Sequence, residues 1–250
     1  MILKTQNILV TGASQGIGAA ISDSLLSQGA QVAMHYNQNR ALAEKHLEAY
    51  GRSQGLAIKA NLELPNEVER LFEEVIKKLH HLDALVLNAG IFEPHAISAA
   101  NEDWWSVWKK TMSINLDAPG LLTKMALEHF KSRGGGRIIY ISSRAAFRGE
   151  TEDYLGYGAS KGGLTSLART VARSFGQFGI KSFVIAPGFT QTAMAAKTIA
   201  QIGDVLRNET SLKEITKPED IAPLVTFMCS GQMDHATGSV IDMNAGSYVH

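Results

Sequence analysis

The apolar residues of this chain gather in short continuous runs, which are separated by stretches with helical spacing. Continuous apolar runs are typical of strands in a parallel sheet, because helices cover both faces of such a sheet. In the longer intervals, apolar residues recur at the spacing of a buried helical stripe. The pattern predicts an α/β fold in which strands and helices alternate. The expected strands are residues 8–11, 31–36, 56–60, 83–87, 137–141, 181–186 and 239–243.

A glycine turn follows the first expected strand. Gly12, Gly16 and Gly18 are spaced G-x-x-x-G-x-G, and a helical apolar face begins directly after them. A glycine backbone can approach a pyrophosphate closely, and the free amides at the start of the next helix can bind it. The spacing differs from the common Rossmann and P-loop motifs, and such a turn can also be a plain connector. The candidate phosphate-binding residues are Gly12, Ser14, Gln15, Gly16, Ile17 and Gly18.

The end of the second expected strand is where a nucleotide-binding βαβ unit meets the adenosine ribose. An acidic residue about 20 positions after the glycines would bind the 2′-hydroxyl of NAD. Tyr36, Asn37 and Arg40 stand there instead. No carboxylate repels a 2′-phosphate at this place, and Arg40 could pair with one or could simply be solvated. We therefore expect NADP(H) rather than NAD(H), although Gln15 occupies a position where a basic residue would add support.

Short polar groups follow the other expected strands. Ligands of open α/β sheets bind at the carboxyl ends of the strands, so these groups should line one cleft. Asn115 is different, because it lies between Ile114 and Leu116 in an apolar helix and needs a partner when it is buried. A bound water, a helix distortion or simple packing would satisfy it. The cleft candidates are Asn61, Leu62, Asn88, Ala89, Gly90, Ser142, Ser143, Pro187, Gly188, Thr190 and Thr192.

Tyr157 and Lys161 stand four residues apart on an expected helix, so they share one face. A lysine in this position favours the ionised phenol and is expected to lower a pKa that is ordinarily about 10. A tyrosine tuned in this way can donate or accept a proton. The pair is common by chance and gains weight only from its context. Close approach of a bulky group is suggested by four glycines of the same helix, Gly156, Gly158, Gly162 and Gly163.

The composition limits the classes of partner. Lys plus Arg and Asp plus Glu each number 24, so no global field favours nucleic acid. The one cysteine, Cys229, excludes an internal disulfide, suits a reducing compartment and is expected to be buried near a helix end. No apolar run approaches the roughly 20 residues of a membrane span, and the first run meets a glycine turn, unlike a signal peptide. We expect a cytoplasmic protein of one domain, residues 1–250, that binds neither membrane nor nucleic acid.

Six motifs stand in register along the chain: Thr11-Gly12-x-x-x-Gly16-Ile17-Gly18, Asn88-Ala89-Gly90, Asn115, Ser143, Tyr157-x-x-x-Lys161 and Pro187-Gly188. Together they resemble the short-chain dehydrogenase/reductase family over essentially the whole chain. The resemblance implies a single Rossmann-like, doubly wound α/β domain. Its seven-stranded, mostly parallel sheet would have the order 3-2-1-4-5-6-7, with helices on both faces.

The resemblance also implies a role for each matching residue. Tyr157 would be the general acid for carbonyl reduction, Ser143 would polarise the carbonyl oxygen, and Lys161 would hold the nicotinamide ribose and tune Tyr157. Asn115 would anchor a water in a proton relay. Two further residues would contact the cofactor, Thr192 at the carboxamide and Asn88 along its path. This chemistry requires no metal.

The serine assignment rests on alignment at the end of the fifth expected strand. Ser143 matches the family's serine there, with Ser142 as a minor alternative. The interval from Ser143 to Tyr157 is one residue longer than the family's usual spacing, so residues 144–155 contain an insertion. Tyr154 is excluded as the acid, because Gly158 rather than lysine follows it by four.

Within the family, the chain is similar to 3-oxoacyl-[acyl-carrier-protein] reductases. That similarity implies a β-ketoacyl thioester, carrier-bound or free, as substrate, and a homotetramer, or a homodimer, built through two long helices. Lys131 and Arg133 could dock an acidic carrier, but Phe178 stands where a second basic group is expected. The alternatives are a reductase or dehydrogenase of a free sugar, polyol or cyclic ketone, and a sensor that binds NADP without turnover.

Three features leave alternatives open. Residues at about 190–212 form either a substrate lid or a plain surface helix. Residues 102–133 are expected to be a shorter helix that leads into a long one, and its cluster of Trp104, Trp105 and Trp108 serves packing, a subunit contact or a substrate wall. Arg144 and Arg148 either meet an anionic substrate or carrier or are solvated.

Overall fold

A seven-stranded sheet runs through the computed structural model, which describes residues 1–51 and 54–250. Its order, β3-β2-β1-β4-β5-β6-β7, confirms the expected one, and each pairing described is parallel rather than only most of them. The predicted strands are all present, and no end differs by more than one residue. The strands are β1 (Asn7–Val10), β2 (Gln31–Tyr36), β3 (Gly55–Lys59), β4 (Ala84–Leu87), β5 (Gly136–Ile141), β6 (Ile180–Pro187) and β7 (Val240–Met243).

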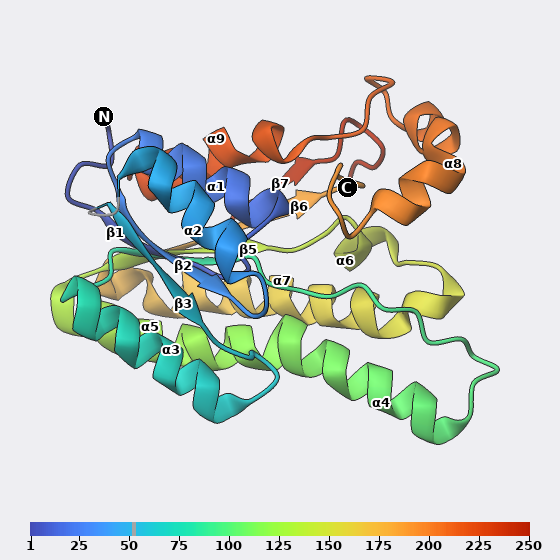
Figure 1. Cartoon of the computed structure of the whole chain (residues 1–250), viewed down its shortest axis with the longest axis horizontal. Helices are drawn as coiled ribbons and strands as arrows, with labels where there is room; N and C mark the ends of the chain where they lie inside the picture. The colour runs from blue at the N-terminus through green and yellow to red at the C-terminus, as the bar shows by residue number, and fades with distance from the viewer. Residues whose placement is uncertain (52–53) are drawn as a thin grey trace.

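Helices cover both faces of the sheet (Figure 1). They are α1 (Gly16–Ser27), α2 (Arg40–Tyr50), α3 (Pro65–Leu79), α4 (Asn101–Met112), α5 (Ala118–Arg133), α6 (Ala145–Arg148), α7 (Leu155–Phe175), α8 (Ala196–Glu209) and α9 (Pro218–Cys229). Shorter helical turns are η1 (Ser113–Asp117), η2 (Glu152–Tyr154), η3 (Gly176–Phe178) and η4 (Asp234–Ala236).

The core consists of two layers, one on each face of the sheet. Alternate residues of a strand point to opposite faces, and β1 shows the consequence. Leu9 packs in the cluster that α3, α5 and α7 complete. Ile8 and Val10 pack in the cluster that α1 and α9 complete. Because both faces are buried, the strands contain continuous apolar runs rather than an alternating pattern.

The segment from α4 to α5 is helical throughout, but its middle turn, η1, is a π-helix. Asn115 lies in this turn and is fully buried. A π-turn inserts one extra residue into a helix and is often found at functional sites. The expected helix distortion at Asn115 is therefore confirmed.

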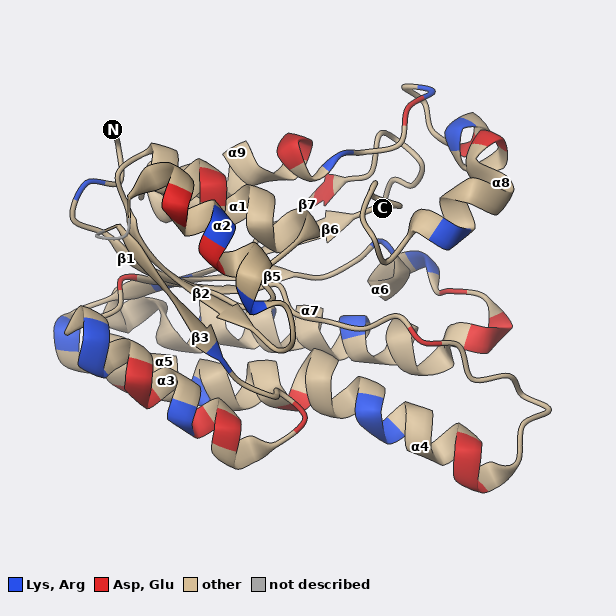
Figure 2. Cartoon of the chain, viewed as in Figure 1, with Lys and Arg blue, Asp and Glu red and all other residues tan. Residues whose placement is uncertain are grey.

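Charged residues of both signs are distributed over the outer helices (Figure 2). On α4, Glu102 and Asp103 stand in the first turn and Lys109 and Lys110 in the last, an arrangement that complements the helix dipole. Among the described helices, none is long and apolar enough to span a bilayer. The charge distribution gives these surfaces no continuous face of one sign.

Two smaller expectations concern the C-terminal third. Cys229 is the last residue of α9 and is buried, as predicted, and burial raises the pKa of its thiol to about 12. Residues at about 190–212 contain α8, which is interrupted by a non-helical backbone at Ile202. This helix lies at the same end of the molecule as α6 (Figure 1).

Candidate active site

A cleft of about 720 Å³ opens at the carboxyl edge of the sheet. This volume is in the range of small-molecule and cofactor sites. Of the predicted site residues, Gly18, Arg40 and Asn115 do not line it. Those that do are Gly12, Ser14, Gln15, Gly16, Ile17, Tyr36, Asn37, Asn61, Leu62, Asn88, Ala89, Gly90, Ser142, Ser143, Tyr157, Lys161, Pro187, Gly188, Thr190 and Thr192.

The glycine turn between β1 and α1 fits a pyrophosphate. Gly12 and Gly16 have φ values of +64° and +58°, in the left-handed region that favours glycine. Gly18 packs so closely on the Gly12 carbonyl and the Asn88 side chain that a Cβ there would overlap both. No side chain caps α1 at Gln15 and its first turn contains no acidic residue, so its amides are available to an anion.

Two side chains hold this turn in place. Asn88 Nδ2 donates hydrogen bonds to the carbonyls of Thr11 (2.9 Å) and Gly12 (3.1 Å). His35 Nδ1 accepts a hydrogen bond from the Gly12 amide, and its Nε2 donates to the Ala60 carbonyl, both at 3.0 Å. Burial lowers the pKa of His35 to about 4, so the ring is neutral. His35 was not among the predicted site residues, although a histidine in a largely apolar strand needs hydrogen-bond partners and so indicates a structural or functional role.

One part of the cleft, where the adenosine ribose is expected, is lined by residues at the end of β2 and directly after it. Tyr36 and Asn37 line it as expected, and Gln38 and Asn39 were not foreseen. Arg40 starts α2 with a 71% exposed side chain, and its Nε pairs with Glu44 at 2.8 Å. The Glu44 carboxylate therefore offsets part of the positive charge that Arg40 could offer to a 2′-phosphate, while its Nη groups remain exposed.

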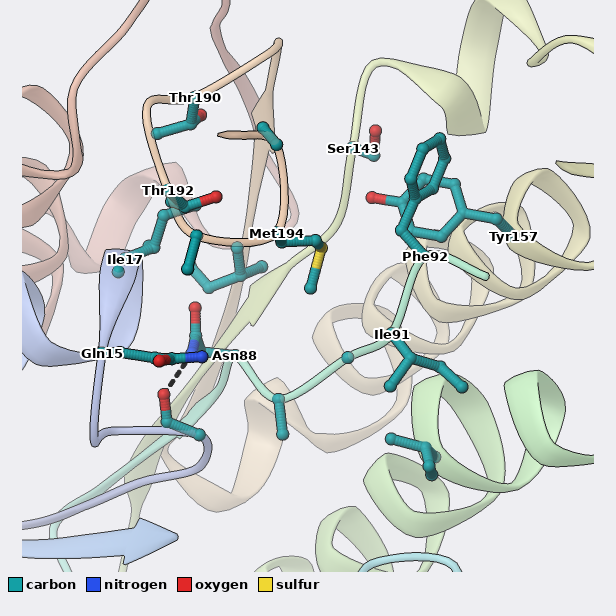
Figure 3. Close-up of a pocket in the computed structure, with 18 of the residues that line it drawn as sticks. Gln15, Ile17, Asn88, Ile91, Phe92, Ser143, Tyr157, Thr190, Thr192 and Met194 are labelled. Carbon is teal, nitrogen blue, oxygen red and sulfur yellow. Dashed lines mark hydrogen bonds between the residues drawn. The ribbon is translucent and has the colours of Figure 1, made fainter. Parts of the chain in front are cut away.

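The two candidate serines have different surroundings. Ser142 Oγ donates a hydrogen bond to the Lys161 carbonyl (3.1 Å) and lies 2.8 Å from Thr165 Oγ1, so it ties β5 to α7. Ser143 Oγ accepts a hydrogen bond from the Ala145 amide at 3.1 Å, and its hydroxyl is close enough to the Tyr157 phenol to lower the pKa of the phenol against the larger effect of burial. Figure 3 shows Ser143, Tyr157 and Phe92 together on one side of the cleft, across from Gln15 and Asn88. The geometry thus pairs Ser143, not Ser142, with the phenol.

The expected effect of Lys161 on Tyr157 is wrong for this structure. Burial raises the pKa of the Tyr157 phenol to about 12, and the hydrogen bond with Ser143 opposes that shift. Lys161 Nζ lies 5.8 Å from the Tyr157 ring centroid and donates to the Ile141 carbonyl at 2.9 Å. Burial lowers the pKa of Lys161 to about 8. Desolvation by burial is therefore the largest influence on both pKa values.

Asn115 connects the segment that follows β4 to α7. Its Nδ2 donates to the Ile91 carbonyl (3.0 Å) and to Ser160 Oγ (3.2 Å), and its Oδ1 accepts from the Ile91 amide (2.8 Å). A Cβ on Gly90 would lie 3.2 Å from Asn115 Oδ1 and 3.5 Å from Lys161 Nζ. Asn115 is therefore next to the lysine but behind the wall of the cleft.

Aromatic rings surround the acid candidate. Phe92 was not among the predicted site residues. Its ring meets the Tyr157 ring edge to face, with centroids 4.7 Å apart, and stacks on the Tyr154 ring at 3.8 Å. Figure 3 places Phe92 beside Tyr157. Tyr154, excluded as the acid from its sequence context, thus supports Phe92.

The tryptophan cluster lies outside the cleft. Trp104 and Trp108 stack at 5.2 Å, Trp104 contacts the buried His95, and Trp105 is half exposed. These contacts correspond to the packing alternative. A Cβ on Gly156 would lie 3.3 Å from Trp108, and one on Gly163 would lie 2.9 Å from Leu116. By contrast, the described residues leave open space at Gly158 and Gly162, so close approach is found at only two of the four helix glycines.

Two arginines follow Ser143. Arg144 is buried and lines the cleft, its Nη1 donates to Ser247 Oγ at 2.6 Å, and Nη2 lies 3.6 Å from Glu209. Burial lowers the pKa of its guanidinium. Arg148 Nη2 lies 3.5 Å from Glu150. Arg144 is therefore not a solvated residue.

No candidate metal site is found in the part of the chain that the structure describes, because no group of three or more His, Cys, Asp or Glu side chains there could hold a metal ion. The groups gathered in the cleft are a phenol, a hydroxyl, an ammonium and a glycine turn. This set can bind a dinucleotide and transfer a proton to or from a carbonyl oxygen.

Comparisons with known proteins agree with this geometry. A family model described as enoyl-(acyl carrier protein) reductase matches residues 12–248. The 3-oxoacyl-[acyl-carrier-protein] reductase FabG of Aquifex aeolicus is 30% identical over 244 residues, with 96% of each chain covered. FabG of Staphylococcus aureus is 30% identical over 248 residues, with 98% of this chain and 99% of the relative covered.

Solved structures show the same fold. A short-chain dehydrogenase from Burkholderia cenocepacia in complex with NADP is 29% identical, with a TM-score of 0.88 and 99% of each chain covered. A short-chain dehydrogenase/reductase of Brucella melitensis, titled glucose/ribitol dehydrogenase, is 27% identical, with a TM-score of 0.89 over 99% of this chain and 98% of that one. The protein is therefore an oxidoreductase that belongs to the short-chain dehydrogenase/reductase family.

Proposed function

We propose that this protein is an NADP(H)-dependent reductase of a ketone, which also oxidises the corresponding alcohol. The observation that carries the proposal is the convergence of Ser143, Tyr157 and Lys161 at one end of a cleft whose other end is a glycine turn. When bound, a nicotinamide dinucleotide supplies or accepts the hydride. The residues of the chain would bind and orient the reactants and move the proton.

Each catalytic candidate would act on the carbonyl oxygen or on its neighbours. The Tyr157 phenol, protonated at neutral pH because its pKa is about 12, would donate its proton to the oxygen as negative charge develops there. Ser143 would donate a hydrogen bond to the same oxygen. Lys161 would bind the ribose hydroxyls of the cofactor, and Asn115, with its bonds to Ile91 and Ser160, would hold the β4 edge against α7.

The cofactor preference is proposed to be NADP(H). No carboxylate directly follows β2, and the amides of Asn37, Gln38 and Asn39 line that end of the cleft. The related Burkholderia cenocepacia structure is a complex with NADP. Initial rates of reduction with NADPH and with NADH test this proposal, and equal kcat/KM values for the two would refute it.

The first candidate substrate is a 3-oxoacyl thioester, free or on an acyl carrier protein. The support comes from curated relatives named 3-oxoacyl-[acyl-carrier-protein] reductase. Lys131, near the end of α5, lies over the Phe178 ring at 4.5 Å, so it presents its cation together with an aromatic ring. Oxidation of NADPH in the presence of acetoacetyl thioesters tests this candidate, and no turnover would remove it.

The second candidate substrate is a free hydroxylated ketone or its polyol. One observation favours it, namely that Arg144 and Glu150 bring charge to the end of the cleft where Tyr157 lies. A pocket for a plain acyl chain would be expected to be mainly apolar. Turnover with short ketoses tests this candidate. Tight NADPH binding without turnover of either class would indicate a sensor instead.

The proposed assembly is a homotetramer, or a homodimer, in the cytoplasm. The long helices α5 and α7 are the surfaces through which we expect subunits to associate. Light scattering of the purified protein tests the assembly, and a monomer at micromolar concentration would contradict it. We further propose that residues at about 190–212, including α8, act as a substrate lid.

A further inference from the structure

The segment between β5 and α7 supplies a charged group that the proposed mechanism does not use. This segment, residues 144–155, contains α6, Glu150 and η2. Arg144 and Glu150 from this segment line the cleft. The segment therefore places both a cation and a carboxylate in the cleft that contains Tyr157.

Glu150 is largely buried but weakly partnered. Its side chain is only 10% exposed, and among the described residues it forms an ion pair with Arg148 alone, at 3.5 Å. A well-formed charge-assisted hydrogen bond is about 2.7–2.9 Å long. A buried carboxylate without good partners is costly, and each of its oxygens can accept more than one hydrogen bond. Glu150 therefore retains capacity for a donor that comes from the cleft.

The carboxylate is close enough to the reacting groups to affect them. Its negative charge contributes to the raised pKa of Tyr157 and opposes the lowering of the pKa of the Arg144 guanidinium. The same side of the cleft has an apolar wall, because Phe92 packs edge to face against Tyr157. A molecule placed with its carbonyl at Tyr157 thus meets an apolar wall and a carboxylate acceptor, whereas Glu93, which also lines the cleft, pairs with Lys110 at 2.7 Å.

We propose that Glu150 accepts a hydrogen bond from a hydroxyl group of the substrate and so selects a hydroxylated ketone, or its polyol, over a plain alkanone or acyl chain. The inference rests on the proposed reductase function, and it favours the second of the two candidate substrate classes over the 3-oxoacyl thioester. A hydroxyl fits better than an ammonium group, because Arg148 pairs with the carboxylate and the cation of Arg144 is nearby. A neutral donor adds no repulsion with these cations.

Turnover gives the first test. The ratio of kcat/KM for erythrulose to that for 2-butanone, with NADPH, is expected to exceed one by about 10- to 100-fold, as for a hydrogen bond to a charged group. In Glu150→Leu this ratio should fall to about 1, because the change removes the acceptor that distinguishes the two substrates. Glu150→Gln should keep part of the preference, since its amide oxygen still accepts. The matched control is Glu152→Gln, an exposed residue of the same segment that does not line the cleft.

Binding gives a second test that does not depend on turnover. With saturating NADP⁺, calorimetry should detect erythritol binding that is at least 10-fold weaker in Glu150→Leu and unchanged in Glu152→Gln, with 1-butanol weak in both. The inference would be overturned if erythritol did not bind to the wild type, or if Glu150→Leu bound erythritol with the same affinity as the wild type. It would also be overturned if an amino alcohol of the same length bound to the wild type more tightly than erythritol. Erythritol binding that depends on Glu150 without turnover of any ketone would support it and would count against the proposed reductase function alone.

Discussion

The cofactor half of the cleft, residues 12–18, 35 and 88–90, is shaped by backbone groups, whereas the substrate half, residues 92 and 143–157, is shaped by side chains. In the cofactor half, left-handed glycines and two side-chain hydrogen bonds to the turn fix amides that an anion can use. In the substrate half, Phe92 stacks on Tyr154 and meets Tyr157 edge to face, while Arg148 and Glu150 pair loosely. Backbone geometry suits a ligand part that stays constant, and side chains suit one that varies between relatives.

The largest expected effect is a loss of catalysis in the substrate half that leaves cofactor binding in the other half intact. Tyr157→Phe removes the proton donor and should lower kcat for ketone reduction by about 10³-fold, within the range of general acid catalysis. NADPH affinity, measured by fluorescence, should stay within about twofold of the wild type. Tyr154→Phe is the control, since Tyr154 only stacks on Phe92, and it should retain near-normal kcat. Full activity of Tyr157→Phe would sink the proposed mechanism.

Substitutions of the two neighbouring serines should separate an effect on catalysis from an effect on protein stability. Ser143→Ala should lower kcat/KM by about 10²-fold, as for loss of a donor to a developing oxyanion. Ser142→Ala should lower the free energy of unfolding by about 1–3 kcal/mol, because the buried Lys161 carbonyl and Thr165 lose a partner. Steady-state kinetics and denaturant unfolding check both. The reverse pattern would reassign the catalytic serine to Ser142.

Lowering the pH should decrease the free energy of unfolding through His35, which holds the glycine turn. Its folded-state pKa of about 4 is below the ordinary 6.5, so the unfolded chain binds the proton first as the pH falls. Stability present above pH 6.5 is therefore lost progressively down to pH 4, by about 3 kcal/mol. His35→Gln can still accept from Gly12 and donate to Ala60 without titrating, so its free energy of unfolding should lack this loss. Parallel curves of unfolding free energy against pH for the two proteins would contradict the assignment.

The smallest effect tests the close packing of the glycine turn. Gly18→Ala places a methyl group against the Gly12 carbonyl and Asn88, and it should lower the free energy of unfolding by about 1–3 kcal/mol and weaken NADPH binding. Gly120→Ala, in α5 with open space around it, should be neutral or stabilising by up to about 1 kcal/mol. Thermal unfolding with and without NADPH checks both. If Gly18→Ala bound NADPH as tightly as the wild type, the turn would not be the pyrophosphate site.

Most of the framework could be predicted from the sequence, because each local signal has one strong physical cause. Apolar runs mark strands whose two faces are covered, so the predicted strands are correct to within one residue at each end. The glycine spacing marks a turn that few other residues can adopt. The polar Asn115 in an apolar helix indicated the distortion that the π-turn confirms.

The remaining features depend on distances and desolvation that no spacing rule contains. Four-residue spacing placed Lys161 near Tyr157, but only the packed structure shows its ammonium bonded to Ile141 and both groups buried, which reverses the expected pKa shift. Likewise, the position of Arg40 in the sequence could not reveal its pairing with Glu44. Sequence alone determined the order of strands and the chemical groups at their ends, because these follow from local patterns and the family resemblance. Tertiary structure alone decided which groups face the cleft and how strongly they are desolvated, because both depend on contacts between residues far apart in the chain.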